Sequence, residues 1–374
     1  MNGVLAGARV VTPDRVLDPG WVEVAAGRIA TVGEGAPPAG STGLRDLGGA
    51  WLVPGYVDLH MHGGGGHSVL ASAADMAAAV AFHRRHGTTR TLVSAVSAPV
   101  GAMYDMAAWA AELTARGATP DGHVLGSHLE GPFLSALRCG AQDPAALLAP
   151  DTGVLRQLLA AGRGTVRVVT VAPELPGGLD LVKALVAEGV VAAVGHTDAS
   201  YRQTAQALAA GAGLLTHAFN GMRGIGHRTP GPVLAAMDDD AAVCELINDG
   251  EHVHAPAARL LFRAMPGRVA LVTDAIEAAG MGDGEYLLGK LPVVVRDRLA
   301  RLSGDGAIAG STLTMDAAVR RAVVEVGLPV ETAVAAATRV PAGVLGIHCG
   351  RIAPGYGADL LVLDDDLAVL DVLA

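Results

Sequence analysis

Aromatic residues are scarce in this chain, since Phe, Trp and Tyr together make up 3% of its 374 residues. Hydrophobic residues nevertheless account for 51% of the sequence, and 50 residues are glycine. We therefore expect the secondary-structure elements to pack closely through small side chains. The length suits one large domain, or a large domain with a small companion.

Cysteine is also rare, and Cys139, Cys244 and Cys349 lie far apart without the spacing of a metal site. The first residues, "MNGVLAGARVVTPD", contain no basic segment before their apolar stretch and no convincing cleavage site, so we expect no signal peptide. An odd number of cysteines without a secretion signal argues against a disulfide framework. The expectation is three free thiols and a cytoplasmic location.

Charged residues make up only 17% of the chain, and the net charge is −10. No run of Lys and Arg exists that would bind a phosphate backbone, so we expect no nucleic-acid partner. The longest uncharged stretches, such as "QALAAGAGLLTHAFNGM", contain polar residues and fall short of the roughly 20 apolar residues that span a bilayer. We expect no membrane partner, and any anionic ligand must be small and locally held.

The two ends of the chain have the residue pattern of short strands broken by turns. "GARVVTPD", "GWVEVAAGRIATVG" and "GLRDLGG" place β-branched residues between Gly, Pro and Asp, and the tail "GRIAPGYGADLLVLD" reads alike. We expect residues 1–53 and 341–374 to pair into one small β-sandwich domain.

Between these ends, strand-like apolar runs alternate with Ala- and Leu-rich helical stretches, which is typical of an α/β fold with a parallel sheet. Eight such runs can be counted: "GYVDLH", "TRTLVSAV", "HVLGSHLE", "VRVVTVAP", "VVAAVGHT", "GLLTHAFN", "VCELINDG" and "RVALVTDA". A (β/α)8 TIM-like barrel needs about 250 residues. We therefore predict such a barrel over residues 54–340.

Polar residues stand at the ends of several of these predicted strands. In a barrel the carboxyl ends of all strands meet on one face, where active sites are built. The candidates, in chain order, are His60 and His62 on the first strand, Glu130 on the third, His196 on the fifth, His217 on the sixth and Asp274 on the eighth.

The "HMH" spacing points two imidazoles to one face of a strand, with Met61 turned the other way. A lone pair of this kind is common by chance, but Glu130, His196 and His217 at matching strand ends favour a metal site. Glu130 lies among apolar and turn residues, where an unpaired carboxylate would be costly and a cation would resolve the cost. The alternative for the later histidines is a satisfied core histidine.

Asp274, in "LVTDAIEAAG", has two interpretations: a helix N-cap or a catalytic carboxylate. We favour the catalytic one, because a metal lowers the pKa of bound water to about 7 and a nearby carboxylate can then accept and return a proton.

The four glycines 63–66 lack the Lys and Ser or Thr that a phosphate-binding P-loop requires. A tight turn or a close backbone approach beside the site is expected instead.

Taken together, several motifs resemble the N-acetylglucosamine-6-phosphate deacetylase family of the metal-dependent amidohydrolase superfamily. They run in order from about Trp51 to Arg320 and are "VPGYVDLHMHG", "HLEGPF", "GHTDAS", "THAFNGM", "INDGEHVH", "LVTDAIEAAG" and "AGSTLTMDAAVR".

The resemblance implies that Glu130, His196 and His217 bind the principal metal. His60 and His62 match members that can hold a second ion, so one or two divalent ions per subunit are expected, with zinc first and iron, cobalt, manganese or cadmium as alternatives. The resemblance makes Asp274 the general base and acid that acts with a metal-activated water. It also implies a homodimer, and substrate contacts at Asn220, Ala218, Arg228, His252, Gln142 and Ala141.

One segment departs from the family pattern. Where many members have Lys-Gly-Ala-His, this chain has "RCGAQDP". Gln142 can hydrogen-bond a sugar hydroxyl or an acetyl carbonyl, but it cannot supply a proton. Any role that a histidine plays there in relatives is therefore in doubt for this chain.

The resemblance implies hydrolysis of N-acetyl-D-glucosamine 6-phosphate to D-glucosamine 6-phosphate and acetate, in amino sugar catabolism and cell-wall recycling. Two alternatives stay open: an amidohydrolase that deacetylates a different N-acyl substrate, and a non-catalytic barrel that binds a sugar phosphate.

Overall fold

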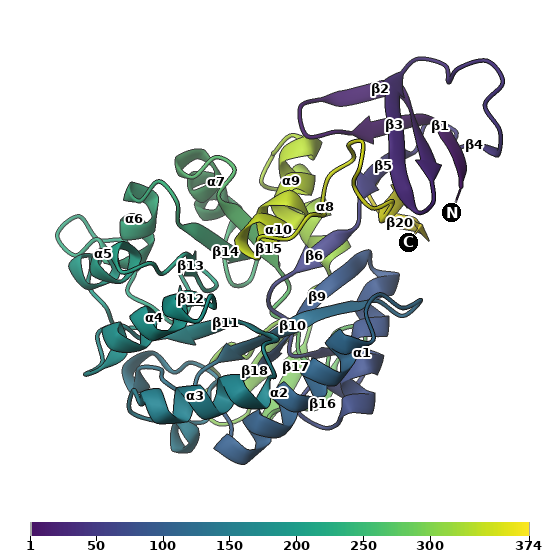
Figure 1. Cartoon of the computed structure of the whole chain (residues 1–374). Coiled ribbons are helices and arrows are strands. Elements are labelled where there is room, and N and C mark those ends of the chain that lie inside the picture. The colour runs from purple at the N-terminus through teal and green to yellow at the C-terminus, as the bar shows by residue number, and fades with distance from the viewer. Residues whose placement is uncertain (1, 374) are drawn as a thin grey trace.

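Eight parallel strands form the larger sheet of the computed structural model, which describes residues 2–373 (Figure 1). Each strand pairs with the next barrel strand along the chain, and each of the eight predicted runs overlaps one of them. They are β6 (Tyr56–Asp58), β9 (Thr88–Ala95), β10 (His123–Glu130), β11 (Val166–Val171), β12 (Val191–Val194), β13 (Leu214–Leu215), β14 (Val243–Ile247) and β15 (Val269–Val272).

The last strand returns to the first, so the sheet is a nearly closed barrel. The Asp274 backbone N–H donates to the His60 carbonyl at 2.8 Å, and the His62 N–H donates to the Ala275 carbonyl at 2.8 Å. A parallel bridge also links Met61 to Ala275. This closure brings the carboxyl ends of the first and last strands side by side.

Helices alternate with the barrel strands along the chain, as the sequence predicts for an α/β fold. Several begin at residues whose side chains cap the free N–H groups: Ser72 accepts from Asp75, and Ser200 forms a capping box with Gln203. The helices are α1 (Ala73–Arg85), α2 (Val100–Ala115), α3 (Thr152–Ala161), α4 (Gly178–Ala187), α5 (Tyr201–Ala209), α6 (Gly231–Asp238), α7 (Ala255–Ala264), α8 (Met315–Val324), α9 (Val330–Ala337) and α10 (Arg339–Val344).

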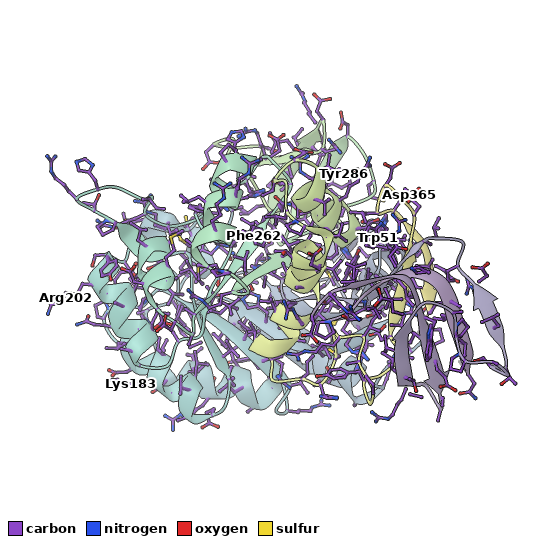
Figure 2. All side chains as sticks on the ribbon, turned by 90° about the horizontal axis from the view of Figure 1, so that it is seen from above. Trp51, Lys183, Arg202, Phe262, Tyr286 and Asp365 are labelled. Carbon is purple, nitrogen blue, oxygen red and sulfur yellow. The ribbon has the colours of Figure 1, made fainter. Side chains whose placement is uncertain are left out.

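The two ends of the chain form a separate seven-stranded sheet, as the texture of their sequences predicts (Figure 1). Its strands are β1 (Gly3–Val11), β2 (Val16–Ala25), β3 (Arg28–Glu34), β4 (Leu44–Asp46), β5 (Trp51–Pro54), β19 (Leu360–Leu363) and β20 (Val369–Leu373). Arg9 stacks on the Trp51 ring at 4.3 Å and donates to Asp365 at 2.5 Å, which ties the first strand to the tail of the chain. Figure 2 shows Trp51 and Asp365 on the same side of the molecule.

A small antiparallel sheet follows the last barrel strand and was not expected from the sequence. It consists of β16 (Gly284–Leu288), β17 (Leu291–Arg296) and β18 (Leu299–Leu302). Buried Leu288, Val293 and Val295 pack against Ile276, which lies just beyond the end of the barrel. The insertion therefore covers part of the face on which the strands end.

The four glycines form the hairpin between β7 (Gly63–Gly64) and β8 (His67–Ser68), which confirms the predicted turn. Gly65 and Gly66 have φ values of 61° and 86°, a left-handed conformation that favours glycine. A Cβ on Gly63 would lie 2.4 Å from the His67 carbonyl oxygen, so the predicted close backbone approach is present as well.

Small side chains fill the core, as the composition predicts. Along α2, Ala107 and Ala110 are fully buried, and along β12 so are Ala192 and Ala193. None of the helices within residues 2–373 is both long and apolar enough to cross a bilayer.

Candidate functional site

The candidate site lies at the carboxyl ends of the barrel strands. Glu130 is the last residue of β10, and the other polar candidates follow the ends of their strands by two residues or, for His62, by four. Because all eight strands are parallel, these positions meet on one face. The side chains are almost completely buried, with exposures of 0% for His60, 5% for His62, 2% for Glu130, 6% for His196, 3% for His217 and 7% for Asp274.

A first group of possible metal ligands consists of Glu130, His196 and His217. The Oε1 atom of Glu130 lies 3.1 Å from Nε2 of His196 and 2.8 Å from Nε2 of His217. The two Nε2 atoms are 3.1 Å apart. These residues come from three different strands, and the structure brings together the three that the sequence analysis assigned to the principal metal.

A second group consists of His60, His62 and Asp274. The two Nε2 atoms are 3.0 Å apart, and Oδ1 of Asp274 lies 3.0 Å from Nε2 of His62 and 3.5 Å from Nε2 of His60. Glu130 borders this group too, since its Oε2 atom is 3.4 Å from Nε2 of His62. The carboxylate of Glu130 therefore lies between the two groups.

Hydrogen bonds at the far side of the rings fix which nitrogen carries the proton. Nδ1 of His62 faces the Ser94 carbonyl at 2.8 Å, and Nδ1 of His196 faces the Arg138 carbonyl at 2.9 Å. A carbonyl only accepts, so Nδ1 must donate, and in a neutral ring Nε2 then holds a lone pair. Lone pairs that face one another and carboxylate oxygens repel unless a proton or a metal cation lies between them. The donor set therefore fits a divalent metal ion.

The electrostatic field of the site favours positive charge. Burial disfavours ionisation of Asp274, but the charge of His60 and the hydrogen bond from His62 outweigh it and bring the pKa of Asp274 to about 2. Burial lowers the pKa of His62, but hydrogen bonds with Asp274 and Glu130 outweigh that effect and raise it to about 9. Both shifts have the same physical origin: carboxylates attract positive charge to these ring nitrogens.

Three of these residues have an unusual backbone. The φ values of His196, His217 and Asp274 are 44°, 29° and 49°, in the left-handed region that side chains other than glycine rarely adopt. Such conformations cost on the order of 1–3 kcal/mol each and concentrate at functional sites. The turn at the end of each strand therefore aims the side chain across the barrel mouth.

A cavity of about 310 Å³ opens above these groups. Glu130, His62, His196, His217 and Asp274 line it, and so do four of the residues that the sequence analysis assigned to the substrate: Ala141, Gln142, Asn220 and His252. This volume lies in the range of small-molecule sites.

Gln142 is fixed by two hydrogen bonds. Its side-chain amide donates to Oε2 of Glu130 at 2.7 Å, and its carbonyl oxygen accepts from the Ser97 backbone N–H at 2.6 Å. Because both ends of the amide are engaged, its orientation is determined. In this chain Gln142 therefore orients Glu130, a role that needs no proton.

The two remaining candidates lie apart from the cavity lining. Ala218 is fully buried, and its backbone N–H donates to the Glu245 carbonyl at 2.8 Å. Arg228 is exposed, on the loop that precedes α6. A single chain thus gathers the metal-binding and acid–base candidates but not the arginine.

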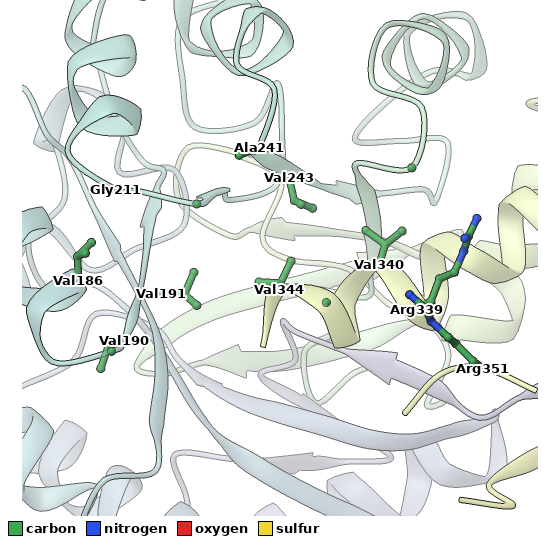
Figure 3. Close-up of a pocket in the computed structure, with 14 residues that line it drawn as sticks. Val186, Val190, Val191, Gly211, Ala241, Val243, Arg339, Val340, Val344 and Arg351 are labelled. Carbon is green, nitrogen blue, oxygen red and sulfur yellow. The ribbon is translucent and has the colours of Figure 1, made fainter. Parts of the chain in front are cut away.

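A larger cavity, of about 550 Å³, lies at the opposite end of the barrel (Figure 3). Val191 and Val243, which line it, are the first residues of β12 and β14, so this is the amino-terminal face. Valines and glycines dominate its lining, and the ligand groups described above are absent from it. Size alone therefore does not identify the site, since the candidate ligands line the smaller cavity.

Sequence reasoning missed two parts of this site. Glu245, within β14, accepts a hydrogen bond from Nδ1 of His60 at 3.1 Å, and Leu288 of the inserted sheet lines the cavity. A signal for the first existed: Glu245 is the one charged residue of the apolar run "VCELI". No comparable signal marks Leu288, because its place depends on how the insertion folds back.

Comparison with known proteins adds a further finding. A model of the amidohydrolase family matches residues 51–373. The N-acetylgalactosamine-6-phosphate deacetylase of Escherichia coli O157:H7 is 37% identical, over 100% of this chain and 98% of the relative. The N-acetylglucosamine-6-phosphate deacetylase of Bacillus subtilis (strain 168) is 33% identical, over 96% of this chain and 93% of the relative.

Among solved structures, a variant of N-acetyl-D-glucosamine-6-phosphate deacetylase from Mycobacterium smegmatis, in complex with N-acetyl-D-glucosamine-6-phosphate, is 44% identical. It superposes with a TM-score of 0.95 and covers 100% of this chain and 97% of its own. The similarity spans both the barrel and the sheet formed by the chain ends.

Proposed function

Because the chain belongs to the amidohydrolase family, among its N-acetylglucosamine-6-phosphate deacetylases, we propose that it hydrolyses the acetamide of N-acetyl-D-glucosamine 6-phosphate. The products are D-glucosamine 6-phosphate and acetate. The observation that carries the proposal is the cavity in which imidazole lone pairs, Glu130 and an ionised Asp274 converge. The reaction belongs to amino sugar catabolism and cell-wall recycling, in the cytoplasm, since a sugar phosphate is too highly charged to cross a bilayer unaided.

The proposed cofactor is one or two divalent ions, with zinc as the first candidate because histidine and carboxylate are its usual ligands. Glu130, His196 and His217 would hold the first ion, and His60 and His62, with Asp274 beside them, would hold a second. When bound, such an ion lowers the pKa of water and polarises the acetyl carbonyl.

The proton transfers are assigned to Asp274. Its low pKa leaves it ionised at neutral pH, so it can accept a proton from the attacking water. It then returns this proton to the departing nitrogen, because an amide anion is too poor a leaving group. Nδ1 of His252 forms a hydrogen bond with Oδ2 of Asp249 at 2.6 Å, which fixes the orientation of the ring at the cavity wall. Asn220 lines the same cavity and offers its side-chain amide to the sugar.

Phosphate recognition is assigned to Arg228, whose guanidinium offers a planar pair of donors. Since this side chain is exposed and lies outside the cavity of its own chain, we place it in the partner's site of a homodimer. The site would then be complete only in the assembled dimer.

Substitution of Arg228 tests the phosphate assignment. Charge-assisted hydrogen bonds contribute about 1.5–3 kcal/mol, so Arg228→Ala is expected to raise KM for the phosphorylated sugar by roughly 10- to 100-fold. Turnover of unphosphorylated N-acetylglucosamine should be unchanged. Steady-state acetate release measures both, with Arg202→Ala as the control, because Arg202 projects from α5 on the outside of the molecule (Figure 2). An unchanged KM for the phosphorylated sugar would show that the substrate is wrongly assigned.

Mixing Arg228→Ala, which should bind the phosphorylated sugar weakly, with the inactive Asp274→Asn tests the dimer at a substrate concentration well below the raised KM. If Arg228 acts across the interface, a mixed dimer contains one site with both residues intact, and activity rises above that of Arg228→Ala alone. If Arg228 acts within its own chain, each site of the mixed dimer lacks one residue, and activity does not rise above that of Arg228→Ala alone.

The galactose epimer is a second candidate substrate. It is supported by the 37% identity to an N-acetylgalactosamine-6-phosphate deacetylase along the whole chain. The two sugars differ only in configuration at C4, so both present the same acetamide and phosphate to the residues named above. The ratio of kcat/KM for the two epimers decides between them.

We propose that strands β6 to β15 and the intervening helices form a (β/α)8 TIM-like barrel over residues 54–340. Residues 1–53 and 341–374 would form a small β-sandwich, in which the sheet folds over a core that includes Val10, Val22 and Leu360. Irregular pairing between β1 and β2 supports such a fold, since bulges bend strands.

A further inference from the structure

Glu245 is a buried carboxylate inside the barrel. It occupies the middle of β14, between the fully buried Cys244 and Leu246, and is itself fully buried. A charge in this position is costly unless another charge or several donors meet it. Within residues 2–373, the ion-pair partner of Glu245 is His60, and no Lys or Arg reaches it.

The contacts of Glu245 join the two groups of possible ligands. Its Oε2 atom lies 3.1 Å from Nδ1 of His60, in the second group, and accepts the backbone N–H of His217, in the first group, at 3.2 Å. The backbone of His217 has a φ of 29°, in the left-handed region, so the carboxylate of Glu245 holds the N–H of a strained turn. One oxygen thus supports a ring in one group and a backbone in the other.

The two ring nitrogens of His60 face different partners: Nδ1 faces Glu245, and Nε2 faces the second group. Because Nδ1 donates to Glu245, Nε2 keeps its lone pair, and this atom faces Nε2 of His62 at 3.0 Å and Asp274 at 3.5 Å. Without the carboxylate, the ring of His60 could turn or carry its proton on Nε2, where it would exclude a cation.

His128, whose ring lies 4.5 Å from that of His60, does not serve this purpose. Its Nδ1 faces the Ser94 hydroxyl at 3.2 Å and its Nε2 faces the Thr170 hydroxyl at 2.7 Å, so both nitrogens are occupied. Of the buried groups around His60, the carboxylate of Glu245 is the one bound to Nδ1.

We propose that Glu245 is a positioning residue that makes the second cation site, at His60, His62 and Asp274, able to bind. This inference rests on the proposed function, because it concerns the metal ions of that site. The carboxylate fixes the tautomer and plane of the His60 ring and makes Nε2 a stronger donor. Carboxylates that hold metal-binding histidines in this way contribute about 10- to 100-fold to metal affinity.

Two substitutions separate geometry from charge. Glu245→Gln keeps an oxygen that can accept from both His60 and His217 but removes the charge. Glu245→Leu removes the acceptor as well. Asp316→Asn is the matched control, because Asp316 also meets a histidine ring at 3.1 Å, that of His86, away from the ligand groups.

Titration of the metal-free full-length chain with Co²⁺ measures the affinity of each site for the ion. The readouts are bound ions per chain and the visible absorption of each site. We expect the affinity for the second ion to fall about tenfold in Glu245→Gln and about a hundredfold in Glu245→Leu, while Asp316→Asn titrates like the wild type. If Glu245→Leu fails to fold by circular dichroism, Glu245→Gln alone decides.

The outcomes are distinct. A wild-type chain that releases acetate and binds two ions, with an unaltered second affinity in Glu245→Gln, overturns the role of Glu245 and leaves the proposed function intact. A wild-type chain that binds one ion and is active also overturns this role. A wild-type chain that binds no divalent ion overturns the metal site, and the role of Glu245 with it.

Discussion

Asp274→Asn is expected to lower kcat for acetate release by about a thousandfold or more, since positioned general acids and bases contribute roughly 10²–10⁴-fold. Asparagine has nearly the same shape but neither accepts nor returns the proton. The distance of 3.0 Å between Asp274 and His62 places the carboxylate beside both the ligand groups and the cavity. The measurement is single-turnover acetate release at saturating substrate.

Binding of the sugar phosphate distinguishes a chemical defect from a lost site. Calorimetry should give Asp274→Asn a substrate Kd within a few-fold of the wild type, because Asp274 does not belong to the residues assigned to the phosphate. If the variant keeps its kcat, Asp274 is not the proton carrier. If the wild type binds the sugar phosphate without releasing acetate, the barrel is a binding protein, the non-catalytic alternative that the sequence left open.

Glu130→Gln is expected to have the second large effect, loss of the tightly held metal and a fall in kcat/KM of about a thousandfold. The carboxylate lies between both ligand groups, 2.8 Å from His217 on one side and 3.4 Å from His62 on the other. A neutral amide removes the charge that both groups share, and its NH₂ group would point a donor at an imidazole nitrogen or at Gln142.

Metal analysis after dialysis against a zinc buffer tests this expectation, with Glu188→Gln as the control at the exposed end of α4. The control should hold as many ions per chain as the wild type. A Glu130→Gln variant that retained the wild-type metal content would mean that His196 and His217 bind the ion without the carboxylate. That result would contradict the assignment of Glu130 as a metal ligand.

The main features of the fold and of the site could be predicted from the sequence because the barrel is parallel. Each polar candidate ends an apolar run, and the carboxyl ends of parallel strands meet on one face whatever the loops do. His60 and His62 lie two and four residues beyond β6 rather than on it, yet their spacing of two residues still brings their Nε2 atoms to 3.0 Å of each other. The local sequence pattern therefore predicts most of the arrangement of the candidate ligands.

Glu245 and the inserted sheet could not be predicted in this way. The contact of Glu245 with His60 joins residues 185 positions apart, and neither the ring tautomer nor the left-handed turns at His196 and His217 leave a trace in a local pattern. The insertion β16–β18 is short and turn-rich, so its place over the barrel mouth follows only from the packing of Leu288, Val293 and Val295.

Arg228 marks a different limit. Its residue type suits phosphate, but in a single chain it lies on an exposed loop outside the cavity. Whether an exposed arginine meets a ligand depends on the assembly of chains, and this is decided by surfaces rather than by the pattern of one strand or helix. The mixing of variants described above addresses it directly.

The decisive measurement is acetate release from N-acetylglucosamine 6-phosphate, beside unphosphorylated N-acetylglucosamine and the phosphorylated galactosamine epimer. The chain is first chelated, single divalent metals are restored, and bound ions are counted. We expect no release after chelation, recovery with a divalent metal, and a strong preference for a phosphorylated sugar. Absence of release from either phosphorylated epimer with every metal would contradict it and point to a different N-acyl substrate.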